Sequence, residues 1–439
     1  MAAASEPERD PDPEPRRGFW SRDFGLFFTA RAVAKLGDTM LPVALAAGLL
    51  LHGYGAGAVG LAMASSVACF AGLVIFGGVV ADRVSTRLLM IGADAVRLVT
   101  QTLAAVMFFT GHVVLWQLCV IGALNGAAAA LFQPGVASTV PRLARDVQGA
   151  NGAIRVAESV MSLAGPAAAG MLVAFVSPGG VFAAHAATYG LSALCLVLLR
   201  LPPAAPRTTA TGKGGAAFRR DLVEGWREFR SRTWLWGVIA IWGLFMLAVS
   251  GPAVPLVAAD VVQEHGPRAY GLVNSALGAG TVVGGLLALR ARPRRMLRAG
   301  AFAVLGFGLF PGTVGAGLGV PAMCAGAAVA GAGMSFWGVM WATSVQTQVR
   351  PEVLNRIHAY DVAGSLAMMP VGQALAGPAA GLLGTDVVLV SGGLLTLVVG
   401  ALLLGVPAIR NLERAEDRPV AGSPVPAPGS APATTPGRR

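Results

Sequence analysis

The chain has 439 residues, of which 55% are hydrophobic and only 13% are charged, and its formal net charge is +11. A soluble domain averages about 25% charged residues, so this composition excludes a soluble globular protein. The positive net charge would suit a nucleic-acid-binding protein, but the positions of the basic residues along the chain do not.

The chain begins with residues 1–22, a proline-rich and polar segment that we expect to be a disordered cytoplasmic tail. Long apolar segments and short polar connections then alternate. Each apolar segment has about 20 residues or more, which is enough to cross the hydrocarbon core of a bilayer as a helix. The twelve segments are 24–51, 56–81, 88–110, 112–140, 149–177, 181–201, 234–260, 269–290, 297–317, 320–348, 357–384 and 386–408.

The longest polar connection, residues 202–233, divides these segments into a first bundle of six (23–201) and a second bundle of six (234–408). Apolar residues at 218, 222, 226 and 229 recur at helical spacing in this linker, which predicts a basic amphipathic helix on the membrane surface. Residues 409–439 are rich in Pro, Ala and Gly, and we expect a second disordered cytoplasmic tail.

The basic residues lie almost entirely on one side of the predicted membrane spans. Of the 33 Lys and Arg residues, 28 fall in the two tails, in the connections on the same side or at the adjoining segment ends (Arg200, Arg290 and Arg298), whereas the other side holds only Arg268. Such a bias places the basic side in the cytoplasm. We therefore predict a multi-pass protein of the plasma membrane with both termini cytoplasmic.

The two halves resemble each other. GGVVADRVSTR at 77–87 aligns with GGLLALRARPR at 284–294, an offset of 207 residues. GPAAAG at 165–170 aligns with GPAAG at 377–381, an offset of about 212 residues. The near-constant offset indicates a duplicated six-helix unit, which is the repeat architecture of many secondary transporters.

Several stretches resemble the major facilitator superfamily of transporters. GGVVADRVSTR matches the signature loop G-x-x-x-D-R-x-x-R-[RK] between the second and third helices, with Thr86 at the first position of its usual basic pair. AGPAAAGML in the fifth helix is similar to the Gly-Pro signature of exporters. ARAVAKLGD (30–38), FQPGVASTVPRL (132–143) and WATSVQTQVRPEVLNRIHAYD (341–361) are similar to the branch of macrolide, drug and siderophore exporters. The resemblance implies the all-α fold of that superfamily, with twelve transmembrane helices in two six-helix repeats.

The resemblance also implies a gate on the cytoplasmic side. There the charges of the signature loop would pair with the start of the eleventh helix when the gate is closed. The alternative is that the arginines only set topology. The gate residues would be Gly77, Gly78, Asp82, Arg83, Arg87, Arg356 and Asp361.

Charged side chains inside a membrane segment are costly and usually face the bundle interior. Arg31, Lys35 and Asp38 share one face of the first helix, with Asp38 near the midplane, which predicts a role in proton coupling or substrate binding. A static Lys35–Asp38 pair is the alternative. Glu158, three residues after Arg155, is the second candidate for carrying the proton.

Two further sets of residues have predicted roles. Gly-Pro elements permit bends or close helix packing, and the packing or hinge residues are Gly165, Pro166, Gly170, Gly377, Pro378 and Gly381. An aromatic wall with few hydrogen-bonding groups suits a bulky amphipathic substrate, and its members are Asn125, Gln133, Trp242, Phe245, Met246, Trp337, Trp341 and Gln346. Packing against lipid is the alternative for the aromatic residues.

Other chemistries find no support. The GAGAVG run at 55–60 follows no strand, no phosphate-binding loop occurs, and the histidines lack metal-ligand spacing, so we expect no nucleotide, no nucleic acid, no metal and no enzymatic activity. The resemblance to exporters implies an efflux transporter of a drug, antibiotic or siderophore. We expect a monomer that is driven by the proton gradient without a cofactor. An importer or lipid flippase on the same fold is the alternative, and a transport-inactive sensor is a more remote one.

Overall fold

A computed structural model of the chain describes residues 20–81, 85–144, 147–201, 227, 229–349, 361 and 364–413, and this part of the chain is helical throughout apart from short turns. The first six helices are α1 (Arg22–Leu51), α2 (Ala56–Ala81), α3 (Thr86–Thr110), α4 (Leu115–Leu143), α5 (Val147–Phe175) and α6 (Pro178–Leu198). The remaining elements are α8 (Thr233–Phe245), the π-helical turn η1 (Met246–Ser250), α9 (Gly251–Arg290), α10 (Met296–Val304), the 3₁₀ turn η2 (Leu305–Gly308), α11 (Leu309–Gly315), α12 (Val320–Gln348), α14 (Met369–Leu383), α15 (Thr385–Gly405) and α16 (Pro407–Arg410).

Eleven helical stretches in the described part of the chain are long and apolar enough to cross a membrane. The longest, Thr233–Arg290, has 58 residues and contains both 234–260 and 269–290. The chain bends at Gly266, whose φ of 84° and ψ of 166° are not helical. A side chain disfavours positive φ, and Pro267 has no N–H to continue the helical hydrogen bonds, so these two residues mark the turn between the two segments.

The shorter turns follow from local capping chemistry. Ser21 and Ser177 each accept a hydrogen bond from a backbone N–H in the first turn of the helix that follows, α1 and α6 respectively. Gly111, with a left-handed φ of 74°, ends α3. Ser177 and Gly111 thus mark the positions at which the chain passes from one helix to the next.

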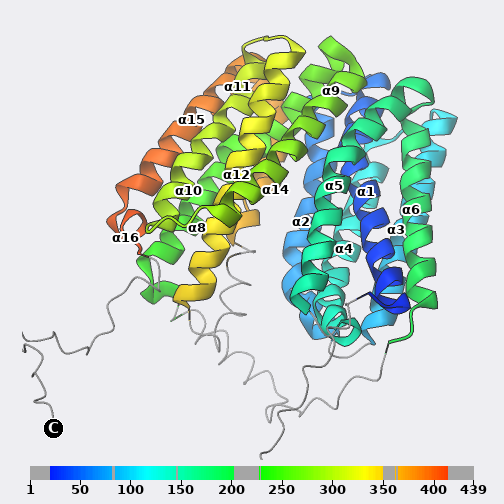
Figure 1. The fold of residues 1–439 in the computed structure, drawn as a ribbon. Helices are drawn as coiled ribbons and strands as arrows, with labels where there is room; N and C mark the ends of the chain where they lie inside the picture. Colours follow the sequence, from blue (N-terminus) through cyan, green and yellow to red (C-terminus); the bar gives the residue numbers. More distant parts are fainter. Residues whose placement is uncertain are drawn as a thin grey trace, which may run out of the picture.

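Figure 1 shows α1–α6 in one bundle and most of the remaining helices in a second bundle beside it. The bundles meet near the end at which α9 bends, and they diverge toward the end at which α1 begins and α16 lies (Figure 1). We call the end at which α1 begins the terminal side, and the end at which α9 bends the opposite side. The contacts between bundles come mainly from α9 with α5 and from α14 with α2.

These contacts depend on glycines that let two backbones approach. A Cβ atom on Gly377 would lie 2.3 Å from the Cα of Gly57, and one on Gly271 would lie 2.6 Å from the carbonyl oxygen of Pro166. Neither backbone can yield without moving its helix, so the opposite side is closed by direct backbone contact.

Candidate functional site

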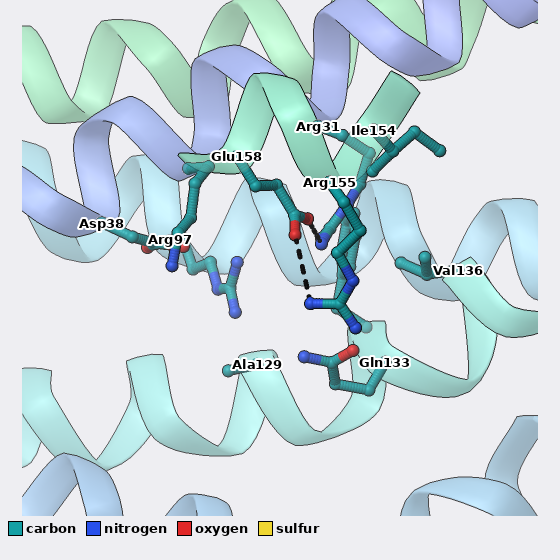
Figure 2. Close-up of a pocket in the computed structure, with 11 residues that line it drawn as sticks. Arg31, Asp38, Arg97, Ala129, Gln133, Val136, Ile154, Arg155 and Glu158 are labelled. Carbon is teal, nitrogen blue, oxygen red and sulfur yellow. Dashed lines mark hydrogen bonds and ion pairs between the residues drawn. The ribbon is translucent and has the colours of Figure 1, made fainter. Parts of the chain in front are cut away.

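Within the first bundle, a cavity of about 350 Å³ is lined by α1, α3, α4 and α5. We call it the charged cavity. Figure 2 shows how its side chains converge. Its lining residues are Arg31, Lys35, Asp38, Arg97, Ala129, Phe132, Gln133, Val136, Ile154, Arg155 and Glu158. The three charged residues predicted on one face of the first helix therefore do share one cavity, together with Arg155 and Glu158.

Glu158 is held by two arginines. The Arg31 guanidinium donates to Oε1 of Glu158 from α1, across the helix interface. The Arg155 guanidinium lies 3.7 Å from Oε2, one turn away on the same helix (Figure 2). The Glu158 side chain is only 14% exposed, whereas that of Arg155 is 85% exposed. Glu158 thus has a cation on each carboxylate oxygen.

Asp38 has different partners. The Tyr189 hydroxyl donates to Oδ1 of Asp38 at 2.5 Å, and Nε2 of His185 lies 3.6 Å from the same oxygen. Both partners lie on α6, and their side chains are almost entirely buried, while the Asp38 side chain is 45% exposed toward the cavity. Lys35 takes part in none of the ion pairs found among the described residues, so the static Lys35–Asp38 pair is not present.

Arg97 lies between Tyr189, the hydrogen-bond partner of Asp38, and the buried residue Asp94. Its guanidinium lies 5.1 Å from the centre of the Tyr189 ring and 4.0 Å from Oδ1 of Asp94. Asp94 is completely buried, and its other oxygen accepts a hydrogen bond of 2.6 Å from Ser192. The side chains of α6 therefore contact Asp38 directly, and Arg97 and Asp94 of α3 form the next layer of polar contacts.

Sequence reasoning did not select His185, Tyr189 or Ser192. Their spacing of four and three residues places them on one face of an otherwise apolar helix, and this polar face was the available signal. Their partner could not be read from the sequence, because Asp38 precedes Tyr189 by 151 residues.

A second cavity, of about 320 Å³, lies in the other bundle. We call it the tryptophan cavity. Trp242 and Trp341 both stack on Trp337, with ring centres 5.3 and 6.2 Å away from it. The Trp341 Nε1–H donates to Asp361 at 2.9 Å. Asp361, predicted as a gate residue, therefore lines this cavity.

The other predicted lining residues are dispersed. Asn125 lines a third, mainly apolar cavity of about 260 Å³ between the bundles, together with Gln101 and Gln373. Gln133 lines the charged cavity. Phe245 and Met246 are buried and line none of these three cavities, and Phe245 packs edge-on against Phe307 at 5.0 Å. The Gln346 side chain lies outside the described part of the chain.

The predicted gate is only partly described. Asp82, Arg83 and Arg356 lie outside the described residues, and of Gly77 and Gly78 the structure describes only that they belong to α2. Arg87 donates from Nε to the Leu196 carbonyl at 2.8 Å and from Nη2 to the Val197 carbonyl. In this conformation Arg87 therefore holds the C-terminal end of α6 within its own bundle.

The predicted packing residues have unequal surroundings. A Cβ atom on Gly165 would lie 2.0 Å from Oγ1 of Thr39 on α1, and one on Gly170 would lie 3.0 Å from the carbonyl oxygen of Pro267. A Cβ atom on Gly381 would meet nothing within 4 Å, so close packing does not account for a glycine there. Pro378 lies within α14, one residue after Gly377.

Comparisons with known proteins assign the chain to a family of membrane transporters, in agreement with its two bundles of helices. Residues 27–366 match the family model described as Major Facilitator Superfamily. The uncharacterized MFS-type transporter YvqJ of Bacillus subtilis (strain 168) is 23% identical over 90% of this chain and 94% of its own length. Macrolide efflux protein A of Streptococcus pyogenes is 21% identical over 90% of this chain and 98% of its own.

Solved structures share the fold. The crystal structure of a POT family transporter in complex with 5-aminolevulinic acid superposes with a TM-score of 0.70 at 13% sequence identity, covering 89% of this chain and 97% of that chain. The similarity extends over both bundles. The chain belongs to the major facilitator superfamily of membrane transporters and is not an enzyme.

Proposed function

We propose that this transporter exports a bulky amphipathic small molecule, such as a drug, antibiotic or siderophore, in exchange for protons. The observation that carries the proposal is the position of Asp38. This acidic residue lies in the middle of α1, and its side chain is exposed to the charged cavity within the first bundle. The similarity to macrolide efflux protein A supports export as the direction.

Asp38 suits the proton-carrying role better than Glu158 does. Tyr189 can donate a hydrogen bond to an ionised carboxylate and can accept one from a protonated carboxyl, so the contact persists through a change of charge. The two arginines that hold Glu158 can only donate. Protonation of Glu158 would leave both guanidinium groups facing an uncharged partner, and we assign it to positioning Arg31 and Arg155.

The arrangement of the bundles supports a proposed transport cycle by alternating access. Backbone contacts join them on the opposite side, and the bundles diverge on the terminal side (Figure 1). We propose that the terminal side faces the cytoplasm, and that substrate and proton reach the cavities from alternate sides as the contacts exchange. In this proposal the chain is a monomer in the plasma membrane with twelve spans, counting Thr233–Arg290 as two, and both termini are cytoplasmic.

The test is proton-driven efflux in everted membrane vesicles, with uptake of a fluorescent macrolide or dye as the readout. We expect Asp38→Asn to lose at least about tenfold of the transport driven by a pH gradient, since a protonatable group is removed. Glu158→Gln should retain a pH-driven component. Asp386→Asn is the matched control, because this exposed carboxylate lies at the start of α15, away from the cavity. Full pH-driven transport by Asp38→Asn would refute the coupling role.

The proposed orientation is tested with two reporter fusions. Because it places the C-terminus in the cytoplasm, a fluorescent protein fused after Arg439 should fluoresce. Because it places Gly266 on the other side of the membrane, alkaline phosphatase inserted there should be active. The reverse pattern would contradict the proposed orientation.

A further inference from the structure

The charged cavity contains more positive than negative charge. Four cationic side chains line it, namely Arg31, Lys35, Arg97 and Arg155, whereas only Asp38 and Glu158 contribute carboxylates. Asp94 lies behind Arg97, completely buried, and adding its charge still leaves an excess of one positive charge. Charges within a membrane protein normally pair with one another, so this excess requires an explanation.

Two of the four cations have no carboxylate in close contact within the described part of the chain. The single carboxylate of Glu158 contacts both Arg31 and Arg155, whereas Asp38 is hydrogen-bonded to Tyr189 rather than to Lys35 or Arg97. Lys35 has no carboxylate partner among the described residues, and it is only half-buried at the cavity wall. Nε of Arg97 is buried without a hydrogen-bond partner, and the closest carboxylate oxygen of Asp94 is 4.0 Å from its Nη1.

We propose that Lys35 and Arg97 bind an anionic group, a carboxylate or a phosphate or sulfonate, carried by the transported molecule. This inference rests on the proposed function for the fate of the ligand and adds its charge class. An anion entering the cavity would supply the missing negative charge in a region of low dielectric, where an ion pair is stronger than in water.

The surroundings fit an anion attached to an apolar body. The Gln133 amide points into the same cavity and has two N–H donors for the remaining oxygen atoms (Figure 2). The Phe132 ring lies 5.6 Å from the Arg97 guanidinium and 5.7 Å from that of Arg31, and it gives the cavity one apolar wall. Val136 and Ile154 extend that wall.

The experiment measures binding rather than transport. The full-length protein is purified into nanodiscs of phosphatidylcholine and titrated with three probes that share one aromatic body: dansylglycine (a carboxylate), dansylamide (neutral) and dansyl-ethylenediamine (an ammonium). Energy transfer from tryptophan to the dansyl group reports occupancy, and excess unlabelled probe defines the saturable part. A parallel series with phosphatidylglycerol in the nanodisc shows whether an anionic lipid headgroup competes for the same site.

We expect dansylglycine to bind at least tenfold more tightly than dansylamide, and dansyl-ethylenediamine to bind most weakly. Lys35→Gln and Arg97→Gln should each reduce the dansylglycine affinity to that of dansylamide without changing dansylamide binding, which also shows that the variants are folded. Lys35→Arg should retain the preference. Arg298→Gln, which removes an exposed cation outside the charged cavity, is the matched control.

Equal affinity for the three probes, tighter binding of the ammonium, or a carboxylate preference that survives Lys35→Gln would overturn the inference. If Arg97→Gln does not fold, Lys35→Gln alone decides it, because Lys35 is at the cavity wall. Loss of anion preference with intact proton-driven efflux would refute only the charge class. Anion preference without proton-driven efflux would refute only the proposed function.

Discussion

The contact between Gly57 and Gly377 makes the closed opposite side sensitive to a single methyl group. In Gly377→Ala the new Cβ would lie 2.3 Å from the Cα of Gly57, whereas ordinary contact begins at 3.4 Å. The helices α2 and α14 would have to separate by about 1.1 Å, the difference between these two distances. The obstructing atom belongs to a backbone, so a side-chain rotation cannot relieve the overlap.

The expected effect is a shift between conformations. Inserting an extra methyl or methylene group into a packed interface costs typically about 1–3 kcal/mol. Because the cost falls on the conformation in which the opposite side is closed, the ratio of the two conformations should change by about 5- to 150-fold in favour of the open one. Transport should slow because the return to the closed conformation becomes unfavourable.

Spin labels at His52→Cys and Leu383→Cys measure this shift, since both residues are exposed at the ends of their helices on the opposite side. The four native cysteines are first replaced by alanine. In Gly377→Ala we expect the longer of two distance populations to grow. Gly381→Ala, on the same helix, is the control, because its Cβ would meet nothing within 4 Å. If both variants give the distances and the transport rate of the parent, close backbone contact does not hold the opposite side shut.

The remaining predictions concern the polar contacts of the first bundle. Tyr189→Phe removes the hydroxyl that donates to Asp38, and a hydrogen bond to a charged group contributes about 1.5–3 kcal/mol. We expect proton-driven transport to fall by about tenfold or more and its pH profile to change. An unchanged pH profile would count against the contact. Arg31→Gln and Glu158→Gln should each lower thermal stability, and a double-mutant cycle should show a coupling above about 0.5 kcal/mol, whereas strict additivity would contradict a direct pair. Arg87→Gln removes the donors to the last carbonyls of α6 and should lower the melting temperature by a few degrees, in the range of about 1 kcal/mol, while leaving the affinity for dansylglycine unchanged.

Hydropathy was sufficient to predict helices that are long and apolar enough to cross a membrane, because length and apolar composition are local properties of the sequence. It placed 234–260 and 269–290 as separate spans, and the structure joins them through helical residues up to the bend at Gly266. The connection could not be predicted in detail, because residues 261–265 are compatible with a helix and the break depends on one backbone conformation.

The charged cavity was predictable in part. Helical spacing put Arg31, Lys35 and Asp38 on one face, and the cost of a charge in the membrane directed that face inward. The pair of Arg155 and Glu158 is local, since the two residues are three positions apart on one helix. The second contact of Glu158 was not predictable, since Arg31 precedes it by 127 positions. Such pairs depend on how helices pack, and the sequence does not state the packing.

The internal repeat illustrates the same limit. Gly165–Pro166 in α5 and Gly377–Pro378 in α14 occupy equivalent places in the two halves, yet they serve different interfaces. Gly165 allows α5 to approach Thr39 within its own bundle, while Gly377 allows α14 to approach Gly57 of the other bundle. The Pro166 carbonyl, rather than Gly165, is the atom of this element that Gly271 of the second bundle approaches. Equivalent sequence thus specifies a close approach in both halves, and the partner is set by which face of the helix the fold turns toward the interface. A gate that opens by moving one bundle must therefore separate Gly377 from Gly57 while the contact between Gly165 and Thr39 stays intact.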